Sequence, residues 1–571
     1  MKQLIKTFWQ TTSRKEKGIF YLLLFLMFIA ANLELLGIGM ILPIVALLTN
    51  PELIQQNRYL KFLYDYLQPE SVQSFLIILC LLIAAVFIFK NLFLVFLTWY
   101  QAKKIFRKVS YTTNILFRNY IFAPYSYYLN RNTADMLSNL QISKNLLHSI
   151  LMSLLMICTE ILNVIMIFAM LVFFVPGATV IMILISIVIS AILFIPLKKI
   201  NLKLGEQRLK KMSERTRNEM QAFQGIKEVK IRSAENLFIR KNDELTYQDD
   251  RNNTLIALFS QIPRFLLESG MISGGMLMLA GYVYFDIANS SILLRFSLIG
   301  VAMVRLMPSL SRIQYHLATV RQLQPLLGSL FDDLYRDFPK EELQQSEHNI
   351  TLQKEISLEN LSFKYENAEK PLFSGYSLKI PVNTSVAFVG KTGCGKTTLV
   401  DLIAGLLQPD SGVILADGIN INQNLRSWRA LIGYVPQFIY LLDDSVLHNV
   451  AFGIPDHEID RARVEECLKI AQLYDFIDSL PQKMDSMIGE AGTRLSGGQR
   501  QRLGIARALY HHPQILILDE ATSALDNETE QAFIEAISSL HGKMTIFVIA
   551  HRLTTTQGCN QIIDLSQKNA K

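Results

Sequence analysis

The chain has 571 residues, half of which are hydrophobic, and a mean hydropathy of +0.26, which is high for a soluble protein. A single core rarely extends beyond about 250–300 residues, so the length predicts at least two domains. The formal charge of +7 does not indicate a nucleic-acid partner, because the lysines and arginines gather between apolar runs and form no basic stripe.

The first apolar run is too long for a cleaved signal peptide and lacks a small-residue cleavage site, so we expect it to remain as a membrane anchor. The cysteines are scattered and never form a C-x-x-C pair, which predicts neither a zinc site nor a disulfide framework. They are Cys80, Cys158, Cys394, Cys467 and Cys559.

The first 310 residues contain runs that are long and apolar enough to cross a bilayer, for which roughly 20 residues are needed. Basic residues cluster before the first run and after the second and fourth runs, which places both chain ends and the two long loops in the cytoplasm. We expect these loops, at about 101–149 and 199–263, to be helical extensions of the spans. The six predicted spans lie at about 19–48, 72–100, 150–175, 177–198, 264–286 and 291–310.

The charged residues that we single out within or beside the predicted spans are Lys90, Arg264, Glu268, Arg295, Arg305 and, just beyond the last span, Arg312. Such residues are costly in lipid and often functional. Arg305 and Arg312 are seven residues apart and share a helical face, which would suit an anionic cargo such as a phosphate or pyrophosphate. Snorkelling to the interface or structural pairing, for example of Arg264 with Glu268, remains the alternative.

Segment 57–68, in the first outward loop, has the spacing of an amphipathic helix. Its helical pattern predicts one apolar face made of Tyr59, Leu60, Leu63, Tyr66 and Leu67. The segment either caps the outer end of the bundle or lies against lipid as an interfacial helix.

The charged, Gln-rich residues 332–350 predict a linker between a helical domain, 1–331, and a soluble domain, 351–571. The soluble domain contains G-x-x-x-x-G-K-[ST] between a strand, Ser385–Val389, and an apolar helix that begins at Thr398. This context predicts a phosphate-binding loop for ATP, in which Lys396 reaches the outer phosphates and Thr397 ligates Mg²⁺. The loop consists of Gly390, Lys391, Thr392, Gly393, Cys394, Gly395, Lys396, Thr397 and Thr398.

A second motif for nucleotide chemistry is the buried β-run 515–518, which ends in Asp519 and Glu520. An acid at the end of such a strand can hold Mg²⁺ through its water shell, and we assign this role to Asp519. The following carboxylate, Glu520, is predicted to polarise the attacking water.

The segment Leu495-Ser496-Gly497-Gly498-Gln499 resembles the signature sequence of ABC transporter ATPase domains. The resemblance extends over essentially the whole chain. It implies the type IV ABC exporter fold, in which an α-helical six-span transmembrane domain precedes an α/β P-loop nucleotide-binding domain. It also implies a homodimer, because Ser496, Gly498 and their neighbours complete the ATP site of the partner in that family.

The resemblance also assigns further roles. Tyr365 is similar to the aromatic residue that stacks on adenine, and Gln437 to the glutamine that contacts Mg²⁺ and the membrane domain. Asp526 lies in a loop similar to one that crosses the dimer interface, and His551 resembles the histidine that senses the γ-phosphate. Two loop helices, near 125–136 and 222–232, are expected to touch the nucleotide domain.

The membrane half is similar to bacterial flippases for lipid-linked oligosaccharides, of the PglK type, which serve protein glycosylation. The similarity rests on the segment 305–309 with Arg312, on Ile262-Pro263-Arg264, on Lys90, and on segment 57–68. It implies a multi-pass protein of the bacterial inner membrane that moves a lipid-linked glycan to the outer leaflet. A general exporter of lipid A, drugs or peptides shares the ATPase motifs, whereas a non-transport ABC ATPase would not need the spans.

Overall fold

The computed structural model describes the following residues: 14–40, 47, 58–69, 71–284, 291–334, 336, 349–366, 368–489, 492–520, 535, 537–550, 556 and 558–567. The chain forms two compact units. The helical unit contains Met1–Ile121 and Arg131–Asp337, and the sheet unit contains Phe122–Asn130 and Phe338–Lys571. The predicted linker lies largely outside the described residues, so the domain boundaries stay a prediction.

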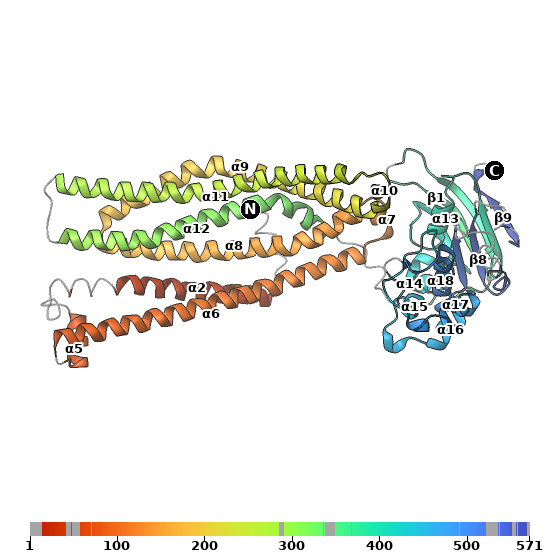
Figure 1. Ribbon diagram of the computed structural model, residues 1–571, viewed down its shortest axis with the longest axis horizontal. Coiled ribbons are helices and arrows are strands. Elements are labelled where there is room, and N and C mark those ends of the chain that lie inside the picture. Colours follow the sequence, from red (N-terminus) through yellow and green to blue (C-terminus); the bar gives the residue numbers. More distant parts are fainter. Residues whose placement is uncertain are drawn as a thin grey trace. The chain divides into compact units, whose positions relative to one another are not determined.

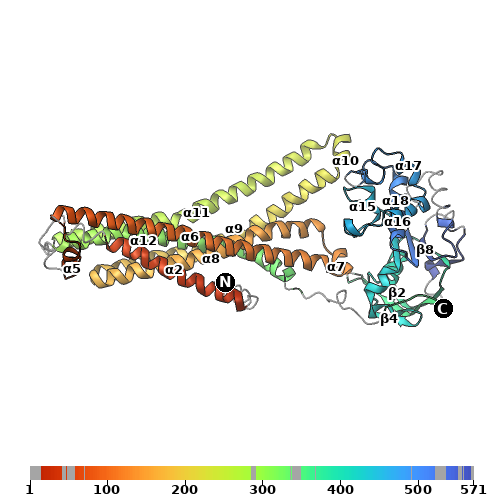
Figure 2. The same ribbon diagram turned by 90° about the horizontal axis from the view of Figure 1, so that it is seen from below.

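The helical unit consists of long helices that run lengthwise beside one another (Figure 1). They continue well beyond the apolar stretches, which confirms that the two long loops are helical extensions. Figure 2 shows α9 and α11 diverging from the remaining helices as they approach the short helix α10. The helices are α2 (Arg14–Gly39), α5 (Arg58–Leu67), α6 (Val72–Ile121), α8 (Thr133–Phe174), α9 (Pro176–Gln224), α10 (Ile226–Ile231), α11 (Glu235–Tyr284) and α12 (Ser291–Leu334).

Four segments of the described helices are long and apolar enough to cross a membrane, and they match four of the predicted spans. They are Arg14–Gly37, Val72–Ile121, Asp135–Phe173 and Glu235–Leu277. The predicted spans 177–198 and 291–310 lie in α9 and α12, where part of the side chains is outside the described residues. The helix break at Val175, between the end of α8 at Phe174 and the start of α9 at Pro176, agrees with the predicted bounds of the third and fourth spans. Proline fits the first turn of a helix.

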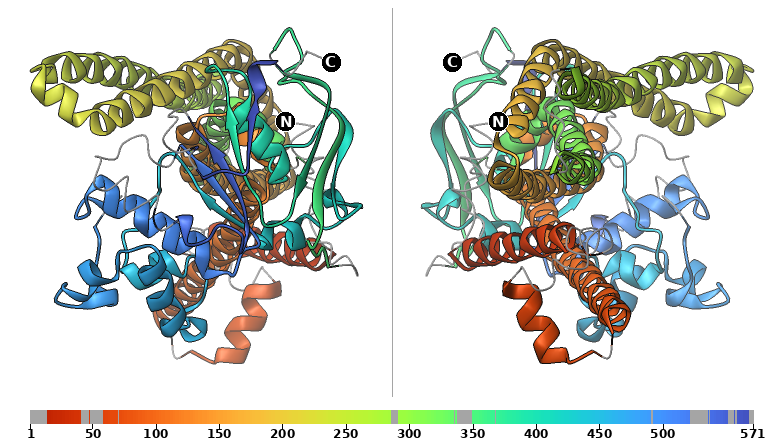
Figure 3. Two further views of the ribbon diagram at one scale, coloured as in Figure 1. Left: turned by 90° about the vertical axis from the view of Figure 1, so that its right-hand side faces the viewer. Right: turned by 90° about the vertical axis from the view of Figure 1, so that its left-hand side faces the viewer.

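Helix α5 lies across the direction of the long helices, which Figure 3 views end-on. Its residues Leu63 and Leu67 pack against a small core that includes Phe75 of α6. The sequence pattern grouped Tyr66 with these leucines, and this was wrong: Tyr66 is 77% exposed and stacks on Phe62. Because Phe62 and Tyr66 are four residues apart, they share a second apolar face that points away from the bundle.

The sheet unit contains a four-stranded sheet of order β2-β1-β4-β5 and a five-stranded parallel sheet of order β6-β7-β8-β3-β9. In the left panel of Figure 3 the teal strands gather on one side of this unit and the blue helices on the other. The strands are β1 (Glu355–Phe363), β2 (Phe373–Pro381), β3 (Ser385–Val389), β4 (Ser411–Ala416), β5 (Ile419–Asn420), β6 (Ile432–Val435), β7 (Ile515–Asp519), β8 (Thr545–Ile549) and β9 (Gln561–Asp564). The helices are α7 (Tyr125–Leu129), α13 (Lys396–Ile403), α14 (Leu425–Ala430), α15 (Val446–Val450), α16 (Arg461–Ile470), α17 (Tyr474–Asp478) and α18 (Gly497–Tyr510).

The parallel sheet determines where the chemistry of the sheet unit can occur. Strands β7 and β8 are buried along their whole length, and β3 is buried except at Val389. The carboxyl ends of parallel strands meet at one edge of a sheet. The residues that follow β3, β6 and β7 therefore lie near one another, and these are the phosphate loop, Gln437 and the acids at the end of β7.

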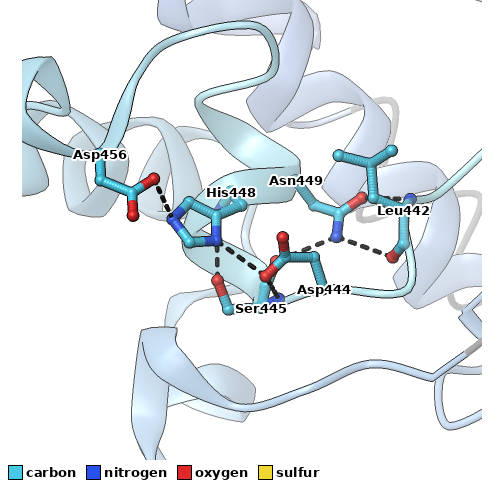
Figure 4. A network of polar contacts seen from close by, with 6 residues as sticks. All are labelled: Leu442, Asp444, Ser445, His448, Asn449 and Asp456. Atoms are coloured by element: carbon cyan, nitrogen blue, oxygen red, sulfur yellow. Dashed lines mark hydrogen bonds and ion pairs between the residues drawn. The ribbon is translucent and has the colours of Figure 1, made fainter. Parts of the chain in front are cut away.

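A polar network at the start of α15 is drawn in Figure 4. His448 lies between two carboxylates, with Nδ1 2.7 Å from Asp444 and Nε2 3.2 Å from Asp456. The hydrogen bond to Asp444 is the main cause that raises the pKa of His448 above 6.5, and the same bond lowers the pKa of Asp444. Ser445 caps the helix by accepting a hydrogen bond from the His448 backbone N–H at 3.2 Å.

We predict a pH-dependent stability effect for His448→Gln. A raised pKa in the folded state means that the histidine contributes stability fully below about pH 6.5 and loses it as the pH rises through the folded pKa. The variant should therefore unfold at a lower temperature than wild type at about pH 6, and the difference should shrink by about pH 9. Intrinsic tryptophan fluorescence of the purified full-length chain measures this transition, because Trp428 is buried in the sheet unit.

The matched control is His457→Gln, since His457 is nearby and its side chain is 79% exposed. We expect this variant to follow the wild-type pH profile. A His448→Gln deficit of the same size at both pH values would contradict the role of the charged imidazole.

Candidate functional site

The phosphate loop connects β3 to α13 and depends on glycine at three positions. Gly390, Gly393 and Gly395 have φ values of 142°, 83° and 99°, which residues with a side chain rarely adopt. At Gly395 a Cβ atom would also come within 2.9 Å of Leu372 and 3.0 Å of Phe373. The loop therefore closes tightly on an apolar floor, and it presents backbone N–H groups at the N-terminus of α13, where phosphate binding is favoured.

Lys396 is 6% exposed and donates a hydrogen bond from Nζ to the Gly390 carbonyl oxygen at 2.8 Å. Its ammonium group thus lies over the loop itself, where the outer phosphates of a nucleotide would be bound. Thr397 follows in the first turn of α13 and is exposed. The roles predicted for both residues stay predictions.

Two carboxylates and a phenol meet beside this loop. The Tyr434 hydroxyl donates a hydrogen bond to Asp519 Oδ2 at 3.0 Å. The negative charge of Asp519 also repels that of Asp401 in α13. Burial, with a smaller effect from Asp519, raises the pKa of Asp401 to about 6. A divalent cation would offset this repulsion, and the carboxylate and hydroxyl oxygens of Asp519 and Thr397 are ligands that Mg²⁺ prefers.

Glu520 follows Asp519 with a φ of 48°, a left-handed conformation that is uncommon for a residue with a side chain. Such strain is often found at functional positions. Gln437 Nε2 donates to Glu520 Oε2 at 2.6 Å, so the predicted base and the predicted glutamine are in direct contact. The sequence motifs predicted both residues but not this contact between them.

Tyr365 is 38% exposed and its hydroxyl forms a 2.8 Å hydrogen bond with Thr398 Oγ1. The ring also contacts Phe363 edge-on, with 5.0 Å between the ring centroids. Tyr365 is therefore fixed beside the first turn of α13, and its stacking on adenine stays a prediction.

The predicted signature residues are found at the start of α18. Ser496 Oγ accepts from the Gln499 backbone N–H at 3.2 Å, and Gln499 Oε1 accepts from the Ser496 N–H at 2.8 Å. This capping box leaves Ser496 and Gly497 exposed at the positive end of a 14-residue helix. Asp526 and His551 lie outside the described residues, so their predicted roles are not tested.

The short helix α7 belongs to the sheet unit although it lies between α6 and α8 in the chain. Asn130, directly after α7, donates to Glu366 at 3.0 Å. Burial raises the pKa of Tyr125, with smaller contributions from the charges of Asp401, Tyr365 and Asp519. The first of the two loop helices thus touches the nucleotide site as expected, whereas α10 belongs to the helical unit and its contact stays a prediction.

The helical unit pairs most of the predicted substrate cations with acids. Lys90 Nζ is 2.9 Å from Glu34 Oε2, and Arg305 Nη1 is 2.6 Å from Glu34 Oε1. Arg312 Nη1 is 2.6 Å from Glu160 Oε1. These three cations therefore form structural ion pairs, which the sequence analysis gave as the alternative to substrate binding. Their partners, Glu34 and Glu160, were not considered there.

Glu34 and Glu160 were missed although each is an acid within a predicted span, which is itself a signal of pairing or function. The pair that was considered, Arg264 with Glu268, does not form: no ion pair within 4 Å joins these two described residues. Arg264 is instead exposed on α11.

Three comparisons with known proteins agree with this geometry. Residues 373–523 match the family described as ABC transporter. The chain is 41% identical over 210 residues to the ATP-dependent lipid A-core flippase of Vibrio vulnificus and 44% identical over 213 residues to that of Cupriavidus pinatubonensis. Each match covers 37% of this chain and 36% of the relative.

A solved structure of a bacterial Atm1-family ABC exporter with ATP bound superimposes with a TM-score of 0.76. It covers 94% of both chains at 21% sequence identity. The chain has the fold of an ABC exporter. The predicted fold class, apolar helices followed by an α/β nucleotide-binding domain, is thereby confirmed.

Gly395→Ala should abolish nucleotide binding, because a methyl group would collide with Leu372 and Phe373 and distort the phosphate loop. The control is Gly418→Ala in the β4–β5 turn, where φ is 83° but no atom lies within 4 Å of the added Cβ. Both variants bear the backbone cost of about 1 kcal/mol, and only the first bears the collision. Binding of a fluorescent ATP analogue should be lost in Gly395→Ala and retained in Gly418→Ala; equal binding by both would contradict the account of the loop.

Proposed function

We propose that the protein is an ATP-driven exporter that works as a homodimer in the bacterial inner membrane, with its nucleotide unit in the cytoplasm. The observation that carries the proposal is the meeting of the phosphate loop, Asp519, Glu520 and Gln437 at one edge of the parallel sheet, in a chain whose other unit is built of membrane-length apolar helices. The cargo is an amphipathic lipid with a phosphate-bearing headgroup, which is moved to the outer leaflet by alternating access.

ATP would bind with its phosphates at the N-terminus of α13, under Lys396. Thr397 and Asp519 would hold Mg²⁺, which neutralises phosphate charge during transfer. Glu520 would orient the attacking water and take its proton as the water oxygen bonds to the γ-phosphorus and the bond to ADP breaks. Gln437 donates a hydrogen bond to the Glu520 carboxylate at 2.6 Å. Through its predicted contact with the membrane unit, Gln437 would couple the position of Glu520 to that unit.

Dimerisation would complete each ATP site. The exposed residues Ser496 and Gly497, with the buried Gly498 next to them, would place the start of α18 against the γ-phosphate bound to the partner subunit, where the positive helix end favours an anion. Closure of the two nucleotide units on ATP would then move the helical extensions, and hydrolysis would reset them.

For the cargo we favour a pyrophosphate-linked oligosaccharide. The cations Lys90, Arg305 and Arg312 in the helical unit, together with the exposed aromatic face of α5, support an anionic headgroup on a long lipid tail. Lipid A-core is the second candidate, because the similar proteins from Vibrio and Cupriavidus carry that name. An exporter of neutral drugs or peptides would not need these arginines.

Glu520→Gln should retain ATP binding and lose ATP hydrolysis by roughly 10²–10⁴-fold, because the amide cannot accept the proton of water. The variant should also hold the two nucleotide units together when ATP and Mg²⁺ are present, which energy transfer between labels on the two copies would measure. Glu466→Gln, at an exposed acid of α16, is the control and should behave as wild type. Normal turnover in Glu520→Gln would remove this residue from the mechanism.

The cargo assignment is tested by ATPase stimulation in nanodiscs. Undecaprenyl-pyrophosphate oligosaccharide should stimulate hydrolysis, whereas undecaprenol should not. Stimulation by lipid A-core alone would favour the second candidate, and stimulation by uncharged amphiphiles alone would contradict a phosphate-bearing cargo.

A further inference from the structure

One carboxylate joins three helices of the helical unit. Oε2 of Glu34 in α2 is 2.9 Å from Nζ of Lys90 in α6. Oε1 of the same carboxylate is 2.6 Å from Nη1 of Arg305 in α12. We call these three residues the Glu34 clasp. With two cations and one anion, the clasp carries one excess positive charge.

The two arms of the clasp differ in exposure. The Lys90 side chain is 4% exposed and that of Glu34 is 16% exposed, so separating them would leave a buried charge without a partner. Lys90 also lies over the Phe87 ring at 4.7 Å, and a Cβ on Gly37 of α2 would come within 3.2 Å of that ring. The Glu34–Lys90 arm is therefore held within the closely packed contact of α2 with α6.

The Arg305 arm is open. Its side chain is 44% exposed, and it meets Glu34 through Nη1, which leaves other guanidinium N–H groups to face a second acceptor. A phosphate group carries up to two negative charges and accepts two parallel hydrogen bonds from a guanidinium, whereas Glu34 carries one charge that it shares with Lys90. A phosphate can thus replace Glu34 at Arg305 without leaving Glu34 unpaired.

We propose that Glu34 is a specificity-determining residue: it holds Arg305 until a phosphate group displaces it, while Lys90 retains Glu34. This inference rests on the proposed function, whose cargo carries such a group. An uncharged amphiphile could not offset the lost Glu34–Arg305 contact, so the clasp would exclude it. An unpaired charge is costly in a membrane, so Arg305 would leave Glu34 only for a ligand that offers another negative charge.

The second ion pair of α12 has a similar form. Glu160 is 3% exposed while its partner Arg312 is 58% exposed. Arg305 and Arg312 are seven residues apart on one helix, so both present an exposed guanidinium backed by a more buried acid on the same face. Seven residues of helix span about 10.5 Å, so α12 offers two separate positions of this kind on one face.

The test measures binding of three small probes to the purified full-length protein in nanodiscs. The probes are farnesyl diphosphate, farnesol and inorganic pyrophosphate. The key variant is Glu34→Gln/Lys90→Met, which removes the buried pair together and leaves Arg305 without its competitor. We expect its affinity for farnesyl diphosphate to rise about tenfold, the equivalent of about 1.4 kcal/mol, with no change for farnesol.

The matched control is Glu16→Gln, which breaks a 2.7 Å pair with Lys108 between the same two helices, α2 and α6, and should leave all affinities unchanged. A rise for farnesyl diphosphate but not for inorganic pyrophosphate would identify a lipid headgroup as the ligand. Equal rises would identify the phosphate group alone, and both results support the exchange. Adding Arg305→Gln to the key variant should abolish the gain.

Equal affinity of wild type and the key variant for every probe would overturn the proposal and leave the clasp with a purely structural role. This failure is distinct from failure of the proposed function, which is decided by ATP-driven lipid translocation and not by these affinities. Thermal unfolding of the key variant is the control for misfolding. A transition at the wild-type temperature would show that a negative binding result does not come from a misfolded protein.

Discussion

The ion pairs of the helical unit are the interactions on which the account of cargo depends. Lys90, Glu34 and Glu160 lie in segments that are apolar enough to cross a membrane, and the three ion pairs that they form with one another and with Arg305 and Arg312 of α12 measure 2.6–2.9 Å. An unpaired charge in such a place costs several kcal/mol, so these contacts constrain how the helices pack. They also connect α12 to α2 and α8, so any motion of α12 must preserve or exchange them.

The sheet unit also holds partly buried charges, here the acids at one edge of its parallel sheet. Its parallel strands place the phosphate loop and the β7 acids at one edge, where burial, with a smaller effect from Asp519, raises the pKa of Asp401 to about 6. Glu520 adopts a left-handed conformation, and its contact with Gln437 holds the predicted base in place. Helix α7 brings Tyr125 to the same region, and the chain joins α7 directly to α6 and α8 of the helical unit.

Local patterns in the sequence predicted much of this arrangement. The phosphate loop, the β7 acids and the cap of α18 are each contained within a few consecutive residues, so spacing alone could identify them. The clasp could not be predicted in this way, because Glu34, Lys90 and Arg305 are distant in sequence and meet only when three helices pack. The face of α5 was partly misassigned for a related reason: Tyr66 is compatible with either side of the helix, and contact with Phe75 selects Leu63 and Leu67 instead.

The most direct test of the central claim is lipid translocation in proteoliposomes that contain the purified protein and a fluorescent polyprenyl-pyrophosphate oligosaccharide. The account predicts movement between leaflets that requires ATP and Mg²⁺ and that fails in Arg305→Ala/Arg312→Ala while ATP hydrolysis persists. A wild-type protein that hydrolyses ATP but moves neither this lipid nor lipid A-core would contradict it.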